Sequence, residues 1–242
     1  MKKLLTLALM LVFATSLFAQ EAPTVEEIAK TYIENMGGVD AMKAVKTTTV
    51  KGKANMQGME FPITITASEG DMQHVEINVQ GQKIIQAYDG ETAWQIMPFA
   101  GITEPTEMSE EEAEQMKDTR FLSEFIDSEE RGFTLESAEG KEVEGTPTYG
   151  VRVTNETGYD HIWYFDTEYM IPVMMTSQVK SGPQKGSTME TYMSDYQEVE
   201  GLMIPMFMEV KFDGATVQKI TMSEVIINPE IDKTMFSIPK KN

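Results

Sequence analysis

From Thr47 to Ile96, and again from about Phe133 to the end of the chain, apolar residues recur at every second position between short turn signals. Phe61, Ile63, Ile65 and Ala67 show this alternation most clearly. The turn signals include Glu69-Gly70-Asp71, Gln80-Gly81 and Asp89-Gly90. Because successive side chains of a strand point to opposite faces, a period of two predicts half-buried antiparallel strands. The pattern predicts a mainly β (α+β) fold of roughly ten strands, arranged as a barrel or a large curved sheet.

Two helices are predicted outside this pattern. Thr24 and Glu27 have the spacing of a capping box, apolar residues follow at helical intervals, and Gly37-Gly38 ends the segment. A short helical turn is expected over Asp40–Val45. In the stretch 102–131, Ser109 precedes three glutamates and predicts a second helix start. The apolar side of this segment consists of Met116, Phe121, Leu122, Phe125 and Ile126. It either covers an opening as a lid or packs permanently on one face of the sheet.

Residues 1–19 have the pattern of a cleavable export signal. Two lysines precede an apolar run, and Ala19 is the small residue at the expected cut. The run is shorter than the roughly 20 residues that a membrane span needs. The sequence therefore predicts a protein exported to the periplasm, with residues 20–242 forming one domain.

The charge balance excludes one class of partner. The chain has 39 acidic and 20 basic residues, for a formal net charge of −19. Such a surface repels the phosphate backbone of nucleic acids, and the sequence contains no basic stripe that reverses this locally. Long-range attraction to anionic lipid headgroups is disfavoured for the same reason.

The sequence offers little for catalysis. It has no cysteine, which excludes disulfides, thiolate metal sites and cysteine nucleophiles. The two histidines, His74 and His161, lie in predicted strands without a catalytic motif, and we expect them to be solvated. No zinc-protease, nucleophile-elbow or phosphate-loop motif is present. We therefore expect no enzyme activity, no cofactor and no metal site.

The 20 methionines are the other unusual count. Thioethers bind soft metals, but these methionines alternate with apolar residues and lack nearby histidine or cysteine ligands. Two interpretations remain open. Methionine either fills an ordinary core or lines an apolar cavity whose walls adapt to varied chains.

Several segments, in order, resemble the LolA/LolB-like family of periplasmic lipoprotein carriers, also described as outer membrane lipoprotein-sorting proteins. The segments are Tyr88–Trp94 (YDGETAW), Trp163–Asp166 running on to Ile171-Pro172, Asp195-Tyr196 with Gly201–Pro205 (GLMIP), and Asn228-Pro229 through Phe236–Pro239 (FSIP). The resemblance implies an unclosed antiparallel barrel in which helices plug or cover a concave, apolar side that holds acyl chains. It also implies an arginine that holds the lid, for which the chain offers Arg120, Arg131 and Arg152.

The resulting hypothesis is a carrier that binds acyl chains of lipoproteins or lipids and moves them toward the outer membrane. Strand parity assigns the cavity lining to Ile63, Ile65, Ile77, Trp94, Ile96, Trp163, Phe165, Met175, Met206, Met208 and Phe212. The lid residues are Met116, Phe121, Leu122 and Phe125. We expect a monomer that meets a membrane-associated donor and acceptor. The alternative is a non-enzymatic lipid-sensing or protein-binding module of the same fold.

Overall fold

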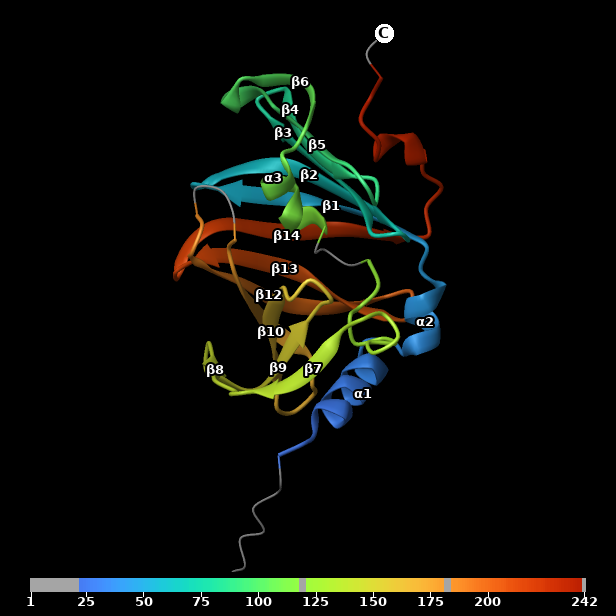
Figure 1. Ribbon diagram of the computed structural model, residues 1–242, viewed down its shortest axis with the longest axis vertical. Helices are drawn as coiled ribbons and strands as arrows, with labels where there is room; N and C mark the ends of the chain where they lie inside the picture. Colours follow the sequence, from blue (N-terminus) through green and yellow to red (C-terminus); the bar gives the residue numbers. More distant parts are fainter. Residues whose placement is uncertain (1–21, 118–120, 181–183, 241–242) are drawn as a thin grey trace, which may run out of the picture.

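The computed structural model describes residues 22–117, 121–180 and 184–240 (Figure 1). The predicted export signal lies outside these residues. The described chain forms an antiparallel sheet in the order β6-β5-β4-β3-β2-β1-β14-β13-β12-β11-β10-β9-β7, with β8 paired to β9. The terminal strands of this order, β6 and β7, do not pair with each other, so the barrel is unclosed, as predicted.

The first half of the sheet is a meander of consecutive hairpins. Its strands are β1 (Thr47–Met56), β2 (Met59–Ser68), β3 (Met72–Val79), β4 (Gln82–Tyr88), β5 (Ala93–Met97) and β6 (Ile102–Glu107). The second half is β7 (Thr134–Ala138), β8 (Glu142–Val143), β9 (Thr146–Thr154), β10 (Asp160–Asp166), β11 (Pro172–Gln178), β12 (Thr188–Val199), β13 (Leu202–Phe212) and β14 (Ala215–Ile227). The pairing of β1 with β14 joins the two halves.

The described residues form 14 strands, so the expected count of about ten is too low. The strands without a clear sequence pattern are β6, β7 and β8. β6 and β7 are edge strands with mostly exposed residues, and β8 has only two residues. Edge strands have no buried face that demands alternation and commonly carry polar residues. A search for alternating apolar residues therefore misses them.

The predicted N-terminal helix is α1 (Val25–Asn35). Its capping box is confirmed: the Glu27 amide donates to Thr24 Oγ1 at 3.2 Å, and the Thr24 amide donates to Glu27 Oε2 at 2.8 Å. Gly37 follows the helix with φ of +121°, and a Cβ there would collide with the carbonyl oxygen of Gly201 in the β12–β13 turn. Both constraints favour glycine. The short helix α2 (Val39–Ala44) then leads into β1.

The mid-chain helix is shorter than its apolar pattern suggested. α3 (Glu110–Lys117) begins after Ser109, whose Oγ accepts from the Glu112 amide at 3.3 Å, so the predicted start is confirmed. Of the expected apolar side, only Met116 lies on this helix. The other members lie in the turn-rich segment 121–133, which we call the mid-chain segment. Two 3₁₀ turns, η1 (Pro98–Ala100) and η2 (Lys233–Met235), complete the described elements.

Candidate functional site

Both longer helices pack against the same face of the sheet. Met108, Ala113 and Met116 of the α3 region pack with Tyr88 and Ala93. Toward the β7 end of the strand order, α1 packs on a cluster formed by Phe125, Phe133, Val151, Val153 and Phe165. Residues directly opposite each other on neighbouring strands lie on the same face of a sheet. The strand pairs from β5 to β9 therefore place the α3 contacts and the α1 contacts on one face. We call it the helix-bearing face.

Between the two helices, in strand order, the helix-bearing face carries a separate apolar cluster. Its buried members are Ala54, Ile63, Ile77 and Ile220, and its half-buried members are Met56, Phe61, Ile65, Val75, Val79, Ile84, Met208 and Met222. These residues come from β1–β4, β13 and β14. We call this cluster the apolar trough. Its half-buried side chains form an apolar surface on the side of the sheet that carries the helices.

The structure brings some of the predicted cavity residues together and separates others. Ile63, Ile65, Ile77 and Met208 lie in the apolar trough. Met175, Met206 and Phe212 share its face by register but not its cluster. Trp163 and Phe165 also lie on this face, where they pack in the α1 cluster. The prediction missed the other trough members, which are Ala54, Met56, Phe61, Val75, Val79, Ile84, Ile220 and Met222. For Ile220 and Met222, a register shift opposite Lys51 and Gly52 interrupts the alternation along β14.

Trp94 and Ile96 lie on the opposite face of the sheet, which corrects their placement by parity. Trp94 pairs with Ala87 of β4, so the two residues share a face. Ile84, which is also on β4, is three positions from Ala87 and therefore lies on the other face, in the trough. The Trp94 indole N–H donates to the Phe236 carbonyl at 2.7 Å, and Phe236 is fully buried. The C-terminal segment therefore covers this part of the opposite face.

His74 lies next to Trp94 and is buried, against the expectation of a solvated strand residue. Its ring centroid is 6.3 Å from that of Trp94. Burial lowers the pKa of His74 below its ordinary value, although the charge of Glu76 acts in the other direction. The sequence could not show this because the covering segment is more than 100 residues away.

The mid-chain segment holds three of the four predicted lid residues. Phe125 is buried in the α1 cluster, with its ring centroid 5.4 Å from that of Phe165. The Phe121 amide donates to Asp71 Oδ1 at 2.9 Å, which ties the segment to the β2–β3 turn. Phe121 and Leu122 are half-buried. The segment thus spans from one end of β2–β3 to β10.

The Arg131 side chain binds backbone carbonyls of the mid-chain segment, to which it also belongs. The guanidinium donates to the carbonyls of Leu122, Ser123 and Ile126 at 3.1, 2.6 and 3.1 Å. It also lies 5.3 Å from the centroid of the Phe133 ring. Of the other arginines, Arg152 pairs with Asp160, and Arg120 lies outside the described residues. Among the described arginines, Arg131 therefore has the contacts that stabilise this segment.

A buried polar group fixes the same segment to the sheet. Glu124 Oε2 lies 2.7 Å from His161 Nε2 and accepts from the Trp163 indole N–H at 3.2 Å. The side chains of Glu124 and His161 are 9% and 7% exposed. The expectation that His161 is solvated is therefore wrong. The Tyr32 hydroxyl of α1 donates to Ser123 Oγ at 3.2 Å, and burial raises the pKa of Tyr32. Sequence reasoning missed these contacts because Glu124 resembles the many solvated acids.

A cavity of about 410 Å³ lies where the mid-chain segment meets α2 and the β2–β3 turn. It is lined by Lys43, Val45, Lys46, Glu69, Gly70, Asp71, Phe121, Leu122 and Arg131. The lysines already have partners, because Lys43 pairs with Asp127 and Lys46 with Glu69 at 3.2 Å. The charges that line the cavity are therefore balanced.

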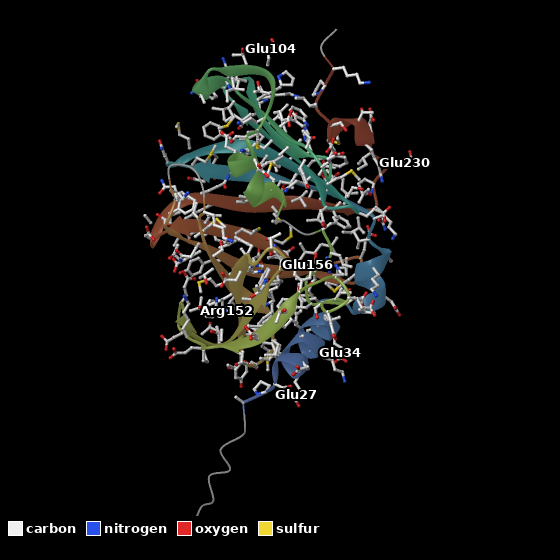
Figure 2. All side chains as sticks on the ribbon, viewed as in Figure 1. Glu27, Glu34, Glu104, Arg152, Glu156 and Glu230 are labelled. Atoms are coloured by element: carbon white, nitrogen blue, oxygen red, sulfur yellow. The ribbon has the colours of Figure 1, made fainter. Side chains whose placement is uncertain are left out.

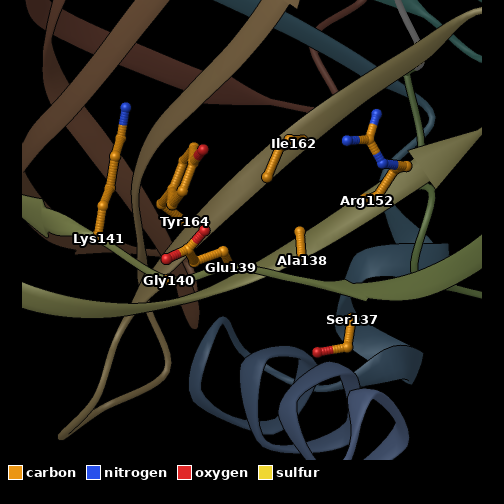
Figure 3. Close-up of a pocket in the computed structure, with 8 residues that line it drawn as sticks. All are labelled: Ser137, Ala138, Glu139, Gly140, Lys141, Arg152, Ile162 and Tyr164. Carbon is orange, nitrogen blue, oxygen red and sulfur yellow. The ribbon is translucent and has the colours of Figure 1, made fainter.

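A second hollow, of about 370 Å³, lies over β9 and β10 (Figure 3). The Lys141 ammonium sits 4.6 Å from the centroid of the Tyr164 ring. Ser137 on β7 also lines this hollow, and Figure 3 shows its side chain on the side of the strand that faces the helices. Tyr164 and Arg152 belong by register to the face opposite the apolar trough, so this hollow is separate from the trough.

The described residues contain no group of three or more His, Cys, Asp or Glu side chains that could hold a metal ion. Within residues 22–117, 121–180 and 184–240, no helix is long and apolar enough to cross a membrane.

No family model and no curated protein matches the sequence. Solved structures do share its fold. A LolA superfamily protein from Nitrosomonas europaea is 12% identical, with a TM-score of 0.58 over 89% of this chain and 98% of that one. A DUF1329 family protein from Desulfovibrio piger is 11% identical, with a TM-score of 0.57 and the same coverages. An outer membrane lipoprotein-sorting protein domain from Vibrio parahaemolyticus is 10% identical, with a TM-score of 0.55 over 86% and 97%. The chain therefore has a LolA-like fold.

Proposed function

We propose that this protein is a periplasmic carrier that binds acyl chains of lipoproteins or lipids in the apolar trough and moves them toward the outer membrane. The observation that carries the proposal is the trough itself, a half-buried apolar surface between α1 and α3 on the helix-bearing face. The similar fold of a lipoprotein-sorting domain supports it. The carrier acts without catalysis, as a monomer that exchanges cargo with a membrane-associated donor and acceptor.

Burial of the cargo supplies the affinity. Each methylene removed from water contributes roughly 0.8 kcal/mol, so six methylenes give about 5 kcal/mol before the cost of ordering. Methionine suits such a wall because its unbranched side chain adapts to varied shapes. The trough has three half-buried methionines, which are Met56, Met208 and Met222. Met175, Met206 and Phe212 extend the proposed binding surface toward β11 and β12.

The mid-chain segment is proposed to cover bound chains. Its anchors are the Arg131 contacts to backbone carbonyls and the Glu124 contact to His161. The Arg131 contacts hold the turns of the segment together, and the Glu124 contact joins the segment to β10 on the helix-bearing face. Met116, Phe121 and Leu122 then supply the apolar surface that faces the cargo. Phe125 packs against α1 and fixes this part of the segment in place.

The first experiment asks whether the protein holds lipid. Protein purified from the periplasm without detergent is extracted with organic solvent and analysed by mass spectrometry, and the delipidated protein is titrated with a fluorescent fatty acid. Co-purified lipid and saturable binding support the proposal. Absence of both contradicts it and favours the sensing or protein-binding module.

Two adjacent isoleucines locate the site. Ile84 belongs to the trough, whereas Ile85 pairs with Ile96 on the opposite face, and both are half-buried on β4. Ile84→Trp fills part of the trough and is expected to weaken fatty-acid binding about tenfold, the effect of roughly 1.4 kcal/mol. Ile85→Trp is the matched control and should bind like the wild type. Equal losses in both variants would place the lipid elsewhere.

A further inference from the structure

Four hairpin turns project from the same end of the sheet. Residues 57–58 join β1 to β2, 80–81 join β3 to β4, 98–101 join β5 to β6, and 213–214 join β13 to β14. These strands are neighbours in the sheet, and every pairing is antiparallel. Figure 1 shows the β1–β2, β5–β6 and β13–β14 turns on the left side. We call this the hairpin end.

Large apolar side chains are exposed at the hairpin end. Phe99 in the β5–β6 turn is 60% exposed, Met59 at the start of β2 is 52% exposed, and Val217 near the start of β14 is 39% exposed. Of the described residues, the other exposed large hydrophobics are Val39 on α2 and Tyr169 after β10. Neither of those two lies in the four hairpins.

Charge at the hairpin end is nearly balanced, because four lysines lie beside five acids, which are Glu60, Glu76, Glu104, Glu209 and Asp213. Lys53 pairs with Glu60 at 2.9 Å, Lys83 with Glu76 at 3.0 Å and Lys219 with Glu209 at 3.4 Å. The whole chain, by contrast, carries a net charge of −19, and its acidic side chains include Glu27 and Glu34 on α1 (Figure 2). An anionic surface repels most of this molecule. It repels the hairpin end only weakly, because the charges there nearly cancel.

The apolar trough runs to the hairpin end. Met56 and Val79 are trough residues that directly precede the turns at 57–58 and 80–81. At the opposite end of β2 and β3, the Phe121 amide is bonded to Asp71 in the β2–β3 turn, which holds the mid-chain segment there. The exposed side chains therefore surround the end of the trough that the mid-chain segment does not occupy.

We propose that the hairpin end is a docking surface for a lipid bilayer, with Phe99, Met59 and Val217 entering the interfacial region. Exposed apolar side chains on tight turns gain free energy on entering that region. The net negative charge elsewhere orients the molecule with this end toward the membrane. This inference rests on the proposed carrier function, because it supplies the route by which acyl chains leave or enter the trough.

The first test is vesicle flotation. Vesicles of phosphatidylethanolamine with a minor fraction of phosphatidylglycerol are mixed with the wild type and with a triple variant, Met59→Ser, Phe99→Ser and Val217→Ser. The vesicle-bound fraction of the variant should fall about tenfold. The double variant Val39→Ser and Tyr169→Ser is the matched control from the other exposed apolar positions and should bind like the wild type. Equal binding by all three proteins overturns the proposal.

The second test uses the absence of cysteine, because one introduced thiol is the only labelling site. Phe99→Cys and Tyr169→Cys are each labelled with an environment-sensitive fluorophore and mixed with the same vesicles. A blue shift at position 99, quenched by lipids carrying a spin label at the headgroup, supports insertion. No shift at position 99, or the same shift at position 169, contradicts it. A shift only with vesicles that carry a membrane protein indicates a protein partner and also overturns the proposal.

The readouts separate this inference from the carrier function. The triple variant leaves the trough residues unchanged, so its fatty-acid binding and co-purified lipid should match the wild type. Loss of vesicle binding with retained lipid supports a docking surface on a carrier. Vesicle binding by a protein that never holds lipid would contradict the carrier and leave the docking surface in place.

Discussion

The carboxylate of Glu124 and the imidazole of His161 meet inside the protein, with Oε2 2.7 Å from Nε2. Glu124 comes from the mid-chain segment and His161 from β10, and the Trp163 indole shares the same oxygen. The group therefore connects a turn-rich segment to the sheet through buried polar contacts. Removing one partner leaves the other buried without its main contact.

Glu124→Ala should lower the free energy of unfolding by about 3 to 5 kcal/mol, because it leaves the buried His161 and the half-buried Trp163 without their shared acceptor. Urea unfolding followed by circular dichroism measures this. Glu129→Ala is the matched control, since Glu129 is exposed on the same segment and should change stability by no more than about 0.5 kcal/mol. Similar values for the two variants would show that the buried contact adds no stability.

Arg131→Ala should loosen the mid-chain segment more than the rest of the fold. The substitution removes the donors to three carbonyls of that segment. Hydrogen exchange with mass spectrometry should then show faster exchange in peptides covering 121–133, with slow exchange retained in β1 and β14. Arg152→Ala tests a half-exposed ion pair with Asp160 and should leave exchange in 121–133 unchanged. Uniformly faster exchange in Arg131→Ala would indicate global destabilisation instead.

Sequence patterns correctly predicted the helix and strands that are stabilised by interactions between residues close together in the chain. The capping box of Thr24 and Glu27 and the alternation of Phe61, Ile63 and Ile65 define their own helix and strand without reference to distant residues. Strand parity failed at Trp94, because the face it occupies is covered by Phe236, 142 residues away. The apolar residue was assigned to the trough when a second apolar environment existed on the other face.

The candidate site, like the fold, was predictable where the strands alternate regularly and not where distant segments meet. Ile63, Ile77 and Met208 were assigned to one face from alternation, and the structure clusters them. The anchors of the mid-chain segment were not, because an arginine that binds carbonyls or a glutamate that meets a histidine 37 positions away has no local signature. The Glu124–His161 contact exists only because the tertiary fold brings the mid-chain segment onto β10, and the Arg131 contacts exist only because the segment turns back on itself.

Stability should fall as the pH is lowered through the range in which free histidine titrates, and His74 should contribute to this fall. Burial lowers the pKa of His74 in the folded protein below its ordinary value of 6.5, so the unfolded chain binds a proton that the folded chain does not. The stabilising effect of neutral His74 is complete above pH 6.5 and is lost as the pH falls toward the folded-state pKa.

Urea midpoints of the wild type and His74→Gln, measured across about pH 5 to 8, test this sign. The difference between the two proteins isolates His74 from the carboxylates that titrate at lower pH. The wild type should lose stability more steeply below pH 6.5 than the variant. Parallel curves, or a steeper loss in the variant, would contradict the assignment.

The C-terminal segment should be as important for stability as a core strand. Phe236 is fully buried, and its carbonyl accepts from the Trp94 indole at 2.7 Å. Phe236→Ala removes a buried ring, which typically costs about 3 to 5 kcal/mol, and should also red-shift the emission of Trp94 as water approaches it. Lys233→Ala, at an exposed position of η2, is the control and should leave both unchanged. A red shift without loss of stability would mean that the segment covers Trp94 but does not help to hold the sheet, whereas loss of stability without a red shift would place the damage away from the indole.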